Sequence, residues 1–258
     1  MSALALKAAA TALWFALVAV WERISPAARE PQTAPRWRRA RNGGLWLMNA
    51  LLNPLLGAPI ALWATQTDVW TRPDWASGAA GIALDLIVLD AWMYAWHRCN
   101  HESPFLWRFH AIHHRDEWLD ATSAVRFHPG EIILAAFARA PVLMLFDITL
   151  AAVIVYETLA LASAIFQHSN VRLSQGLERS LRRVIVTPSH HWLHHHAQRR
   201  AADSNYATIL TMWDRAFGTY NAAPRTPSLS IGLEGARDAG LPSLLRAPFA
   251  ANAGARSA

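Results

Sequence analysis

The sequence predicts an all-α integral membrane protein, a helical bundle with a cytoplasmic helical cap that carries a multi-histidine site for two metal ions. Three observations support this fold class. Of the 258 residues, 53% are hydrophobic and only 16% are charged, and long apolar runs alternate with arginine-rich segments. The 13 tryptophans suit helix ends at the lipid headgroups. All 12 histidines lie between His97 and His196, most of them in three short groups.

Residues 1–96 are expected to form about three transmembrane helices. The first runs from Ala3 to Trp21, and we interpret it as a retained signal-anchor because the basic residues follow the apolar run; a cleaved signal peptide is the alternative. The second, Leu45 to Thr65, contains two prolines and a glycine and should be kinked or broken. The third extends from Gly78 to Trp96.

The charge pattern predicts the orientation. Arginines cluster between Glu22 and Asn42, and such clusters favour the cytoplasm. The third helix then returns to that side, which puts the first histidine pair at the cytoplasmic boundary. This topology accounts for the net charge of +6, so we expect a multi-pass membrane protein with no nucleic-acid partner.

The rest of the chain divides into four segments. Residues 97–131 and 168–221 form two cytoplasmic histidine-box regions. Between them, residues 132–167 are apolar but short for two full spans, which predicts a tight or partly inserted membrane hairpin that turns near Asp147. Residues 222–258 are rich in Ala, Pro, Ser, Gly and Arg without periodicity, which predicts a disordered tail.

The histidine spacing predicts the metal site. Residues three and four apart share a face of a helix, and eight histidines follow this spacing: His97 and His101; His110, His113 and His114; His191, His194 and His195. Imidazole binds iron, zinc and copper, and one zinc site takes about four ligands, so eight rings indicate two metals. Histidines without a metal are the simpler alternative. Three packed groups disfavour it, since many ring nitrogens would lack partners.

Two residues near the first pair have competing interpretations. Asp90 lies seven residues before His97 on the same helical face, where it could hydrogen-bond a ligand ring. Pairing with an arginine or hydroxyl inside the bundle is an equal alternative. Cys99, the single cysteine, lies off the histidine face, so we expect neither a ligand role nor an intrachain disulfide.

From about Asp90 to Tyr220 the sequence resembles the fatty acid hydroxylase and sterol desaturase superfamily of membrane di-iron enzymes. The motifs that carry the resemblance are HRCNH at 97–101, LWRFHAIHH at 106–114, RFHPGE at 126–131, QHSN at 167–170, TPSHHWLHH at 187–195, NY at 205–206 and WDRAFGTY at 213–220. Arg115 departs from the small residue that many relatives carry, which weakens inference about the substrate but not about the ligands.

The resemblance implies two iron ions as cofactors, although zinc can occupy such sites on isolation, with O2 as co-substrate. The implied reaction is oxidation of a lipid C–H bond in a fatty acyl chain, sterol or related lipid. Hydroxylation is favoured and desaturation at the same site is the alternative. An external electron donor of the ferredoxin or cytochrome b5 type, with its reductase, is expected because the chain lacks nucleotide, haem and iron–sulfur motifs.

The resemblance adds His168 to the eight expected ligands. Four further residues remain candidates for a ligand or for a hydrogen-bond partner of one, in addition to Asp90: His128, His190, Asn205 and Asp214. For His128 a structural role is slightly favoured, and for Asp214 an ordinary ion pair or cap is equally plausible. Among the carboxylates near the histidine groups, Asp203 could hydrogen-bond a ligand ring, and Glu131 is a nearby carboxylate without an assigned role. We expect no carboxylate ligand, and we expect His196 to be exposed.

Two other functional classes are considered. A zinc hydrolase is disfavoured because His101-Glu102 does not continue to a histidine at Phe105, as HExxH requires. A membrane metal transporter or metal-binding protein is the other alternative. Transport sites usually lie near the bilayer midplane, whereas these histidines are expected at the cytoplasmic edge, which favours the enzyme.

Overall fold

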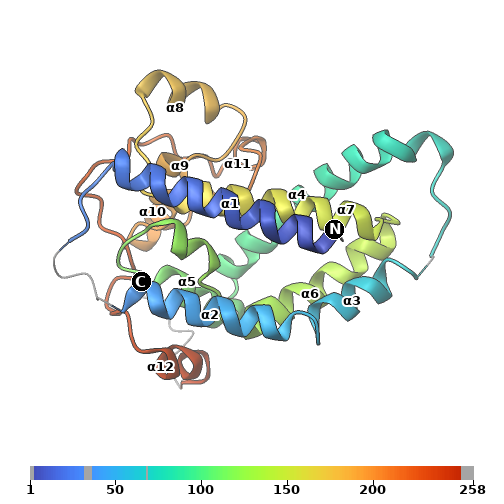
Figure 1. Ribbon diagram of the computed structural model, residues 1–258, viewed down its shortest axis with the longest axis horizontal. Coiled ribbons are helices and arrows are strands. Elements are labelled where there is room, and N and C mark those ends of the chain that lie inside the picture. The colour runs from blue at the N-terminus through green and yellow to red at the C-terminus, as the bar shows by residue number, and fades with distance from the viewer. Residues whose placement is uncertain (1–2, 32–36, 68, 251–258) are drawn as a thin grey trace.

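The computed structural model describes residues 3–31, 37–67 and 69–250, and these residues form an all-helical fold (Figure 1). No β strand occurs within those ranges, only isolated bridges such as the one that joins His196 to Ile231. The predicted fold class, an all-α membrane bundle with a multi-histidine cluster, is therefore confirmed.

The bundle consists of six helices: α1 (Ala3–Ile24), α2 (Arg38–Leu52), α3 (Gly57–Ala64), α4 (Gly78–Glu102), α6 (Pro129–Leu145) and α7 (Leu150–His168). Three stretches are long and apolar enough to cross a membrane, namely Ala5–Ile24 of α1 and the whole of α4 and α7. The pair α2 and α3 counts as a fourth if it is one span bent by 46°. This bend confirms the break that the prolines and glycine of the second predicted span indicated.

Helix α4 continues past the predicted end of the third span. It runs without interruption to Glu102, so His97 and His101 lie on its last turns. The hydroxyl of Ser103 then accepts a hydrogen bond from the backbone N–H of Leu106 and caps α5 (Pro104–His114). A proline at the first helical position and a serine cap explain why a new helix starts here.

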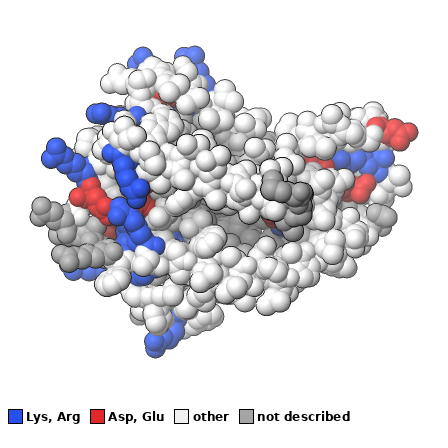
Figure 2. Space-filling model, viewed as in Figure 1, with Lys and Arg blue, Asp and Glu red and all other residues white. Residues whose placement is uncertain are grey.

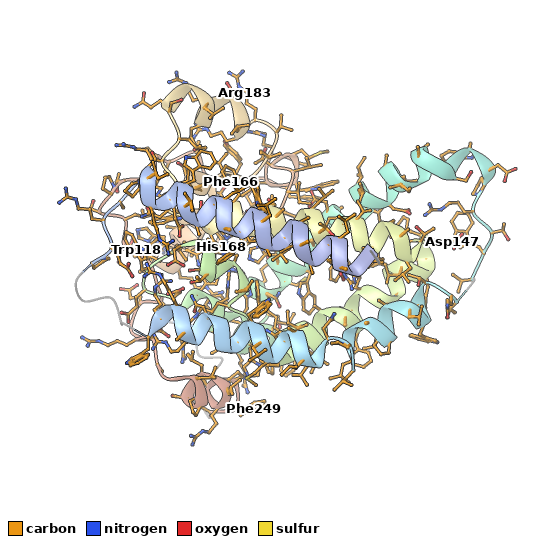
Figure 3. All side chains as sticks on the ribbon, in the orientation of Figure 1. Trp118, Asp147, Phe166, His168, Arg183 and Phe249 are labelled. Carbon is orange, nitrogen blue, oxygen red and sulfur yellow. The ribbon has the colours of Figure 1, made fainter. Side chains whose placement is uncertain are left out.

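The segment after residue 131, expected to be a tight or partly inserted hairpin that turns near Asp147, does turn there, but its two helices are not tightly paired. Helices α6 and α7 meet at a turn where Asp147 has φ 49°, and this turn lies at the opposite end of α7 from His168 (Figure 3). However, α6 packs chiefly against α3, and α7 packs against α4 and α1. The two helices pack mainly against other elements and not against each other, and of the two only α7 is long and apolar enough to span.

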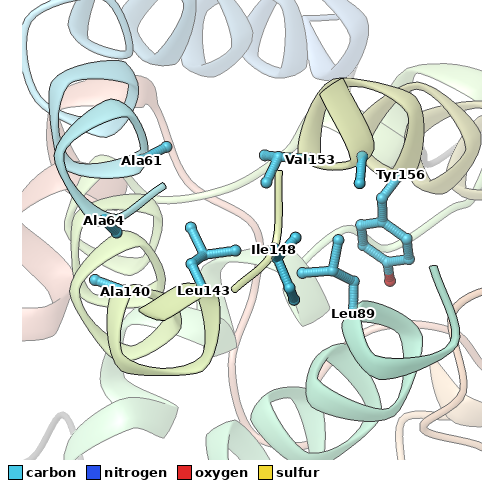
Figure 4. Packing of buried hydrophobic residues seen from close by; sticks show 9 residues of the cluster. Ala61, Ala64, Leu89, Ala140, Leu143, Ile148, Val153 and Tyr156 are labelled. Carbon is cyan, nitrogen blue, oxygen red and sulfur yellow. The ribbon is translucent and has the colours of Figure 1, made fainter. Parts of the chain in front are cut away.

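The bundle core joins four helices. Leu89 of α4, Ala140 and Leu143 of α6 and Val153 of α7 pack with alanines of α3 (Figure 4). Outside the core, leucines remain exposed, among them Leu13 at 62%. On the face drawn in Figure 2, charged side chains gather at the two ends and leave an uncharged middle band, as expected for a surface in contact with lipid.

Short helices form a cap at the end of the bundle where α4 and α7 finish. They are α5, η2 (Ala121–Val125), α8 (Gln175–Leu181), α9 (Pro188–His194), α10 (Arg199–Ala202), α11 (Met212–Ala216), α12 (Leu241–Arg246) and η3 (Ala247–Phe249), while η1 (Asp74–Ala76) lies before α4. Pro188 occupies the first turn of α9, as the sequence indicated.

The tail expected to be disordered is packed against the cap as far as residue 250. The side chain of Asp238 is 0% exposed and forms ion pairs with Arg126 and Arg41, and Leu244 packs between Leu45 and Ile112. Composition suggested disorder because the segment lacks periodicity; a few long-range contacts order it instead. Residues 251–258 of the predicted tail lie outside the described residues.

Candidate metal centre

Nine buried histidines form two adjoining groups. A five-histidine group consists of His97, His101, His110, His114 and His194, and a four-histidine group consists of His113, His168, His191 and His195. Within each group, one ring nitrogen per residue lies within 4.8 Å of the others. The groups touch where the rings of His114 and His195 stack with centroids 4.3 Å apart. These nine are the nine residues that the sequence and the resemblance proposed as ligands.

Each HxxHH motif contributes to both groups. Helix α5 places His110 and His114 in the five-histidine group and His113 in the four-histidine group. At the end of α9, His194 enters the first group and its neighbour His195, which caps the helix, enters the second. The shared helical face brings the rings near one another, but the neighbouring helices decide which group each ring joins.

Backbone carbonyls orient four of the rings through their Nδ1 atoms. The acceptors are Tyr206 O for His97 at 2.8 Å, Arg126 O for His113 at 3.1 Å, Ala164 O for His168 at 2.7 Å and Ser204 O for His194 at 2.8 Å. Because a carbonyl can only accept, each Nδ1 carries the proton and each Nε2 keeps its lone pair. Such bonds fix the tautomer in which Nε2 binds a metal.

Carboxylates orient two more rings. Glu131 Oε1 lies 2.8 Å from His110 Nδ1, and Asp203 Oδ1 lies 3.2 Å from His101 Nδ1. Glu131 is only 4% exposed. A carboxylate on Nδ1 also raises the basicity of Nε2 toward a metal.

The donor atoms fit metal ions better than they fit one another. Four pairs of Nε2 atoms lie 3.0–3.1 Å apart: His101 and His114, His113 and His168, His168 and His191, His191 and His195. Where both Nδ1 atoms of a pair carry the protons, the two Nε2 lone pairs repel unless a cation lies between them. Two ligands each about 2.1 Å from one metal stand roughly 3.0 Å apart at an angle of 90° and roughly 3.4 Å apart at the tetrahedral angle. The Nε2 atoms of His110 and His194 are buried with no hydrogen-bond partner among the described residues.

The surroundings keep the cap histidines neutral. Burial lowers the pKa of His194 to about 3. The hydrogen bond to the backbone of Ser204 raises this pKa and offsets only part of the effect of burial. Burial, followed by the charges of neighbouring rings, lowers the pKa of His113, His114, His191 and His195 well below the ordinary value. Neutral imidazole is the form that binds a metal, so the cluster could hold metal ions.

Three of the candidate residues contact the backbone that holds the ligand rings and not the rings themselves: His190, Asn205 and Asp214. None of them belongs to either histidine group. Asp214 accepts hydrogen bonds from the backbone N–H of Tyr206 at 2.8 Å and pairs with His190 Nε2 at 3.1 Å. Asn205, with φ 57°, donates to the carbonyl of His190. Together they shape the loop whose carbonyls, from Ser204 and Tyr206, hold His194 and His97.

Asp90 does not bond to His97. Its carboxylate accepts hydrogen bonds from the Tyr156 hydroxyl at 3.3 Å, the Trp213 indole at 2.8 Å and the Leu210 backbone N–H at 3.1 Å. Of the two interpretations offered, pairing with a hydroxyl inside the bundle is the one that the contacts match. Asp90 therefore ties α4 to α7 and to the segment before α11.

His128 has a structural role and not a ligand role. Its Nδ1 accepts from the Gly130 backbone N–H at 2.9 Å as the cap of α6, and its Nε2 donates to the carbonyl of Leu245 at 3.1 Å. Both ring nitrogens are thus engaged. His196 also lies outside the two groups and is intermediate in exposure rather than fully exposed.

Sequence reasoning found one partner of a ligand, Asp203, which contacts His101, and missed the others. Glu131 was noted only as a nearby carboxylate, and the carbonyls of Arg126, Ser204 and Tyr206 carry no side-chain signal. The RFHPGE motif at 126–131 contained two of these four residues, but only the packing of α5 against α6 shows what they contact.

An apolar cavity of about 220 Å³ opens beside both histidine groups. His97, His110, His113, His168 and His191 line it together with apolar side chains from α4, α6 and α7, among them Ile132 and Leu161. The arrangement suits the binding of an alkyl segment next to a metal.

Comparisons with known proteins agree with this geometry. The chain matches the fatty acid hydroxylase family over residues 82–219, more than half of its length. It is 29% identical to ornithine lipid hydroxylase OlsE of Rhizobium tropici, over 76% of this chain and 58% of that protein. It is 30% identical to human alkylglycerol monooxygenase over 59% of this chain and 32% of that protein.

A third relative is the rat cholesterol 25-hydroxylase, 24% identical over 70% of this chain and 62% of that protein. The chain thus spans less than two thirds of the length of each of these relatives. No solved structure matches the chain significantly.

Proposed function

This chain belongs to the fatty acid hydroxylase family, and from that premise we propose that it is a membrane-bound, O2-dependent oxidoreductase that hydroxylates a C–H bond of a lipid. One observation carries the proposal: two adjoining groups of histidines border an apolar cavity at the end of a membrane bundle. The names of the relatives, two hydroxylases and a monooxygenase, favour hydroxylation over desaturation.

The proposed cofactors are two iron ions, one held by each histidine group. When bound, such ions supply the O2 activation that an unactivated C–H bond requires. The chain contributes the positions of the rings. Carbonyls and carboxylates on Nδ1 hold the Nε2 atoms of six of the nine rings ready, which limits the reorganisation needed when a metal binds.

The cavity would position the substrate. Small and apolar residues of α6 and α7, such as Ala135, Ala160 and Ala164, leave space for an alkyl segment beside His168 and His191. The apolar walls exclude water from the reacting carbon, which protects it from side reactions. The uncharged band of the bundle (Figure 2) supports entry of the lipid from the bilayer.

The orientation and the electron supply are part of the proposal. Arg38 pairs with Asp116 and Asp120 just after α5, so the arginine-rich segment lies at the same end as the histidines. Since arginines favour the cytoplasmic side, we place the site at the cytoplasmic face. There it would receive electrons from a soluble or membrane-bound donor of the ferredoxin or cytochrome b5 type, with its reductase.

The test uses membranes that contain the full chain, supplied with a ferredoxin, its reductase and ¹⁸O2. Untargeted lipid mass spectrometry should find a lipid that has gained one labelled oxygen atom, and this product should be absent with His113→Ala. His196→Ala, outside both histidine groups, is the matched control and should retain the product.

Other outcomes identify the rival functions. A lipid that loses two hydrogen atoms without gaining label would make the protein a desaturase. Cellular metal accumulation with an unchanged lipid profile would make it a transporter. Metal analysis of the purified protein, before and after reconstitution with iron or zinc, decides which ion supports the reaction.

A further inference from the structure

Three charged side chains from three helices meet in the membrane bundle. Glu157 of α7 pairs through Oε2 with Lys7 of α1 and through Oε1 with Arg139 of α6, at 3.0 Å in each case. Charged residues within transmembrane helices are costly, and they commonly pair with one another and mark the path of a substrate or an ion. This charged cluster of Lys7, Arg139 and Glu157 is therefore a candidate functional site.

The charged cluster lies deeper in the bundle than the histidines. Glu157 and His168 are 11 residues apart in α7, which corresponds to about 16 Å along the helix. Lys7 lies near the start of α1, whereas Glu22 at the other end of that helix accepts a hydrogen bond from the cap at Ala121. An extended chain advances about 3.6 Å in three bonds, so an alkyl chain of roughly 13 bonds bridges the distance from the charged cluster to the histidines.

Two walls of the histidine cavity lead toward the charged cluster. Ala135 of α6 and Leu161 of α7 line the cavity. Arg139 and Glu157 each lie four residues from one of these, on the same helical face and one turn further from the cap. Since α6 and α7 pack mainly against other elements, the ion pair between Arg139 and Glu157 connects the two helices just beyond the cavity.

A third wall, on α4, leads to the same place. Trp96 lines the cavity, and Trp92, one turn further from the cap, stacks on it with ring centroids 6.1 Å apart. The guanidinium carbon of Arg139 lies 6.0 Å from the centre of the Trp92 ring. Apolar and aromatic surface therefore continues from the histidines to the charged cluster.

The charged cluster has an excess of positive charge. Two cations share one carboxylate, and Glu157 is the only acidic residue in the described part of the chain that forms an ion pair with either of them. Asp90 of α4 instead accepts hydrogen bonds from neutral groups. One bound monoanion would bring the charged cluster into balance.

The two cations can also be reached and have donors to spare. The side chains of Arg139, Lys7 and Glu157 are 12%, 23% and 37% exposed. Each cation donates one hydrogen bond to Glu157, whereas lysine has three N–H donors and arginine has five. Carboxylate and phosphate oxygens are the acceptors that such donors bind most strongly.

Resting on the proposed lipid hydroxylation, we infer that Lys7 and Arg139 bind the anionic group of the substrate, a carboxylate or a phosphate. The alkyl chain then follows α6 and α7 to the histidines. The protein selects anionic lipids, and the carbon that it oxidises is set by the distance from the charged end. A neutral lipid of equal chain length is a poor substrate.

The experiment measures binding to the full chain, purified in a neutral detergent with its metals, anaerobically and without an electron donor. Hexadecanoate, hexadecyl phosphate and hexadecanol share one alkyl chain, and mildly alkaline pH keeps the first two ionised. The measured quantity is the affinity for each anion divided by the affinity for the alcohol. Comparing this ratio between variants in one detergent cancels the different partitioning of the probes into micelles.

Lys7→Met and Arg139→Gln each remove one cation. Each should lower the ratio for the preferred anion about tenfold, as expected for one charge-assisted hydrogen bond, while metal content and Tm stay close to wild type. Lys7→Met leaves the pair of Arg139 and Glu157 intact and decides the question if Arg139→Gln does not fold. Arg23→Gln removes an exposed cation at the other end of α1 and should keep the ratio of wild type.

Glu157→Gln separates ligand binding from a purely structural role of the charged cluster. It removes the competing carboxylate and frees both cations, so the ratio should rise above that of wild type. A structural cluster would lose the same contacts in all three variants, and the ratio would then change in the same direction in each of them.

An unchanged ratio in Lys7→Met and Arg139→Gln, or a ratio that falls in Glu157→Gln as well, overturns the inference. The anion with the higher ratio in wild type identifies the group that is bound. Lipid oxidation together with an unchanged ratio would refute this inference alone. A ratio that depends on both cations, without oxidation of any lipid, would refute the proposed function alone.

Discussion

His194 and His195 are neighbours in sequence, yet their rings lie at 90° to each other and belong to different histidine groups. His194 donates from Nδ1 to the carbonyl of Ser204, whereas His195 Nε2 lies 3.1 Å from His191 Nε2. The end of α9 falls between them, since His195 caps the helix. One dipeptide thus supplies both proposed metal positions.

The two histidines should therefore control different metals. His194→Ala should lower the metal content of the five-histidine group and His195→Ala that of the four-histidine group, so each variant retains about one ion per chain. Activity should fall by more than the roughly 10–100-fold that follows loss of an outer partner of a ligand. Metal analysis of purified protein, with His196→Ala as control, checks this. Loss of both ions from both variants would show that the groups are not separate sites.

Metal removal should destabilise the protein. Without ions, the facing Nε2 atoms of residues such as His113 and His168, 3.1 Å apart, lose the cation that holds them together. Ligands that bind only the folded state raise Tm, so chelation should lower it by at least about 5 °C. Thermal unfolding in micelles, before chelation and after iron is restored, measures the effect. A Tm that chelation does not move would argue against a bound metal.

Asp214→Asn should weaken metal binding without touching a ligand. The carboxylate accepts from the backbone N–H groups of Tyr206 and Ala207 and pairs with His190, and an amide nitrogen cannot replace both acceptors. The carbonyl that holds His97 should become mobile, with roughly tenfold weaker iron binding. Iron titration checks this. Asp74→Asn, an exposed carboxylate at the other end of the bundle, should bind iron like wild type.

The C-terminal segment should be needed for stability. Asp238→Ala leaves Arg126, whose side chain is 0% exposed, without its anionic partner, and breaking a buried pair in this way costs about 3–5 kcal/mol. Because the carbonyl of Arg126 holds His113, metal content should fall as well. Denaturant unfolding of the micellar protein measures the loss. Glu234→Ala, an exposed neighbour, is the control, and equal stability of the two variants would mean that the segment is dispensable.

Gly130→Ala should disturb the start of α6. A Cβ at this position would lie 2.6 Å from Phe109 Cε1, closer than packed atoms tolerate, and such overpacking costs about 1–3 kcal/mol. The neighbouring contact between Glu131 and His110 should loosen as a result. Gly176→Ala in α8, which has no atom within 4 Å of the added Cβ, should be neutral or slightly stabilising. Unfolding free energies that do not differ would contradict the steric argument.

Local sequence patterns predicted the membrane helices and the histidine groups. The apolar runs indicated the membrane helices, including the break between α2 and α3, because length and hydropathy are properties of a continuous segment. The three histidine groups were visible since residues three and four apart share a face of any helix. The motifs around them also indicated the family.

Other features could not be read from such patterns. The tail, expected to be disordered, packs against the cap through Asp238 and Leu244. For Asp90 the sequence left a bond to His97 and pairing inside the bundle as equal alternatives, and the structure decides for the second, with bonds to Tyr156 and Trp213. Each contact joins residues far apart in the chain, and the choice among possible partners depends on how whole helices pack.

By itself, the sequence determined that this is a helical membrane protein with three histidine groups, because helix periodicity and hydrophobic length act within one segment. Only the tertiary structure decided which rings share a group and which carbonyl or carboxylate orients six of the nine rings. These depend on contacts between segments as distant as His97 and Tyr206, and the packing of the bundle and its cap sets those distances.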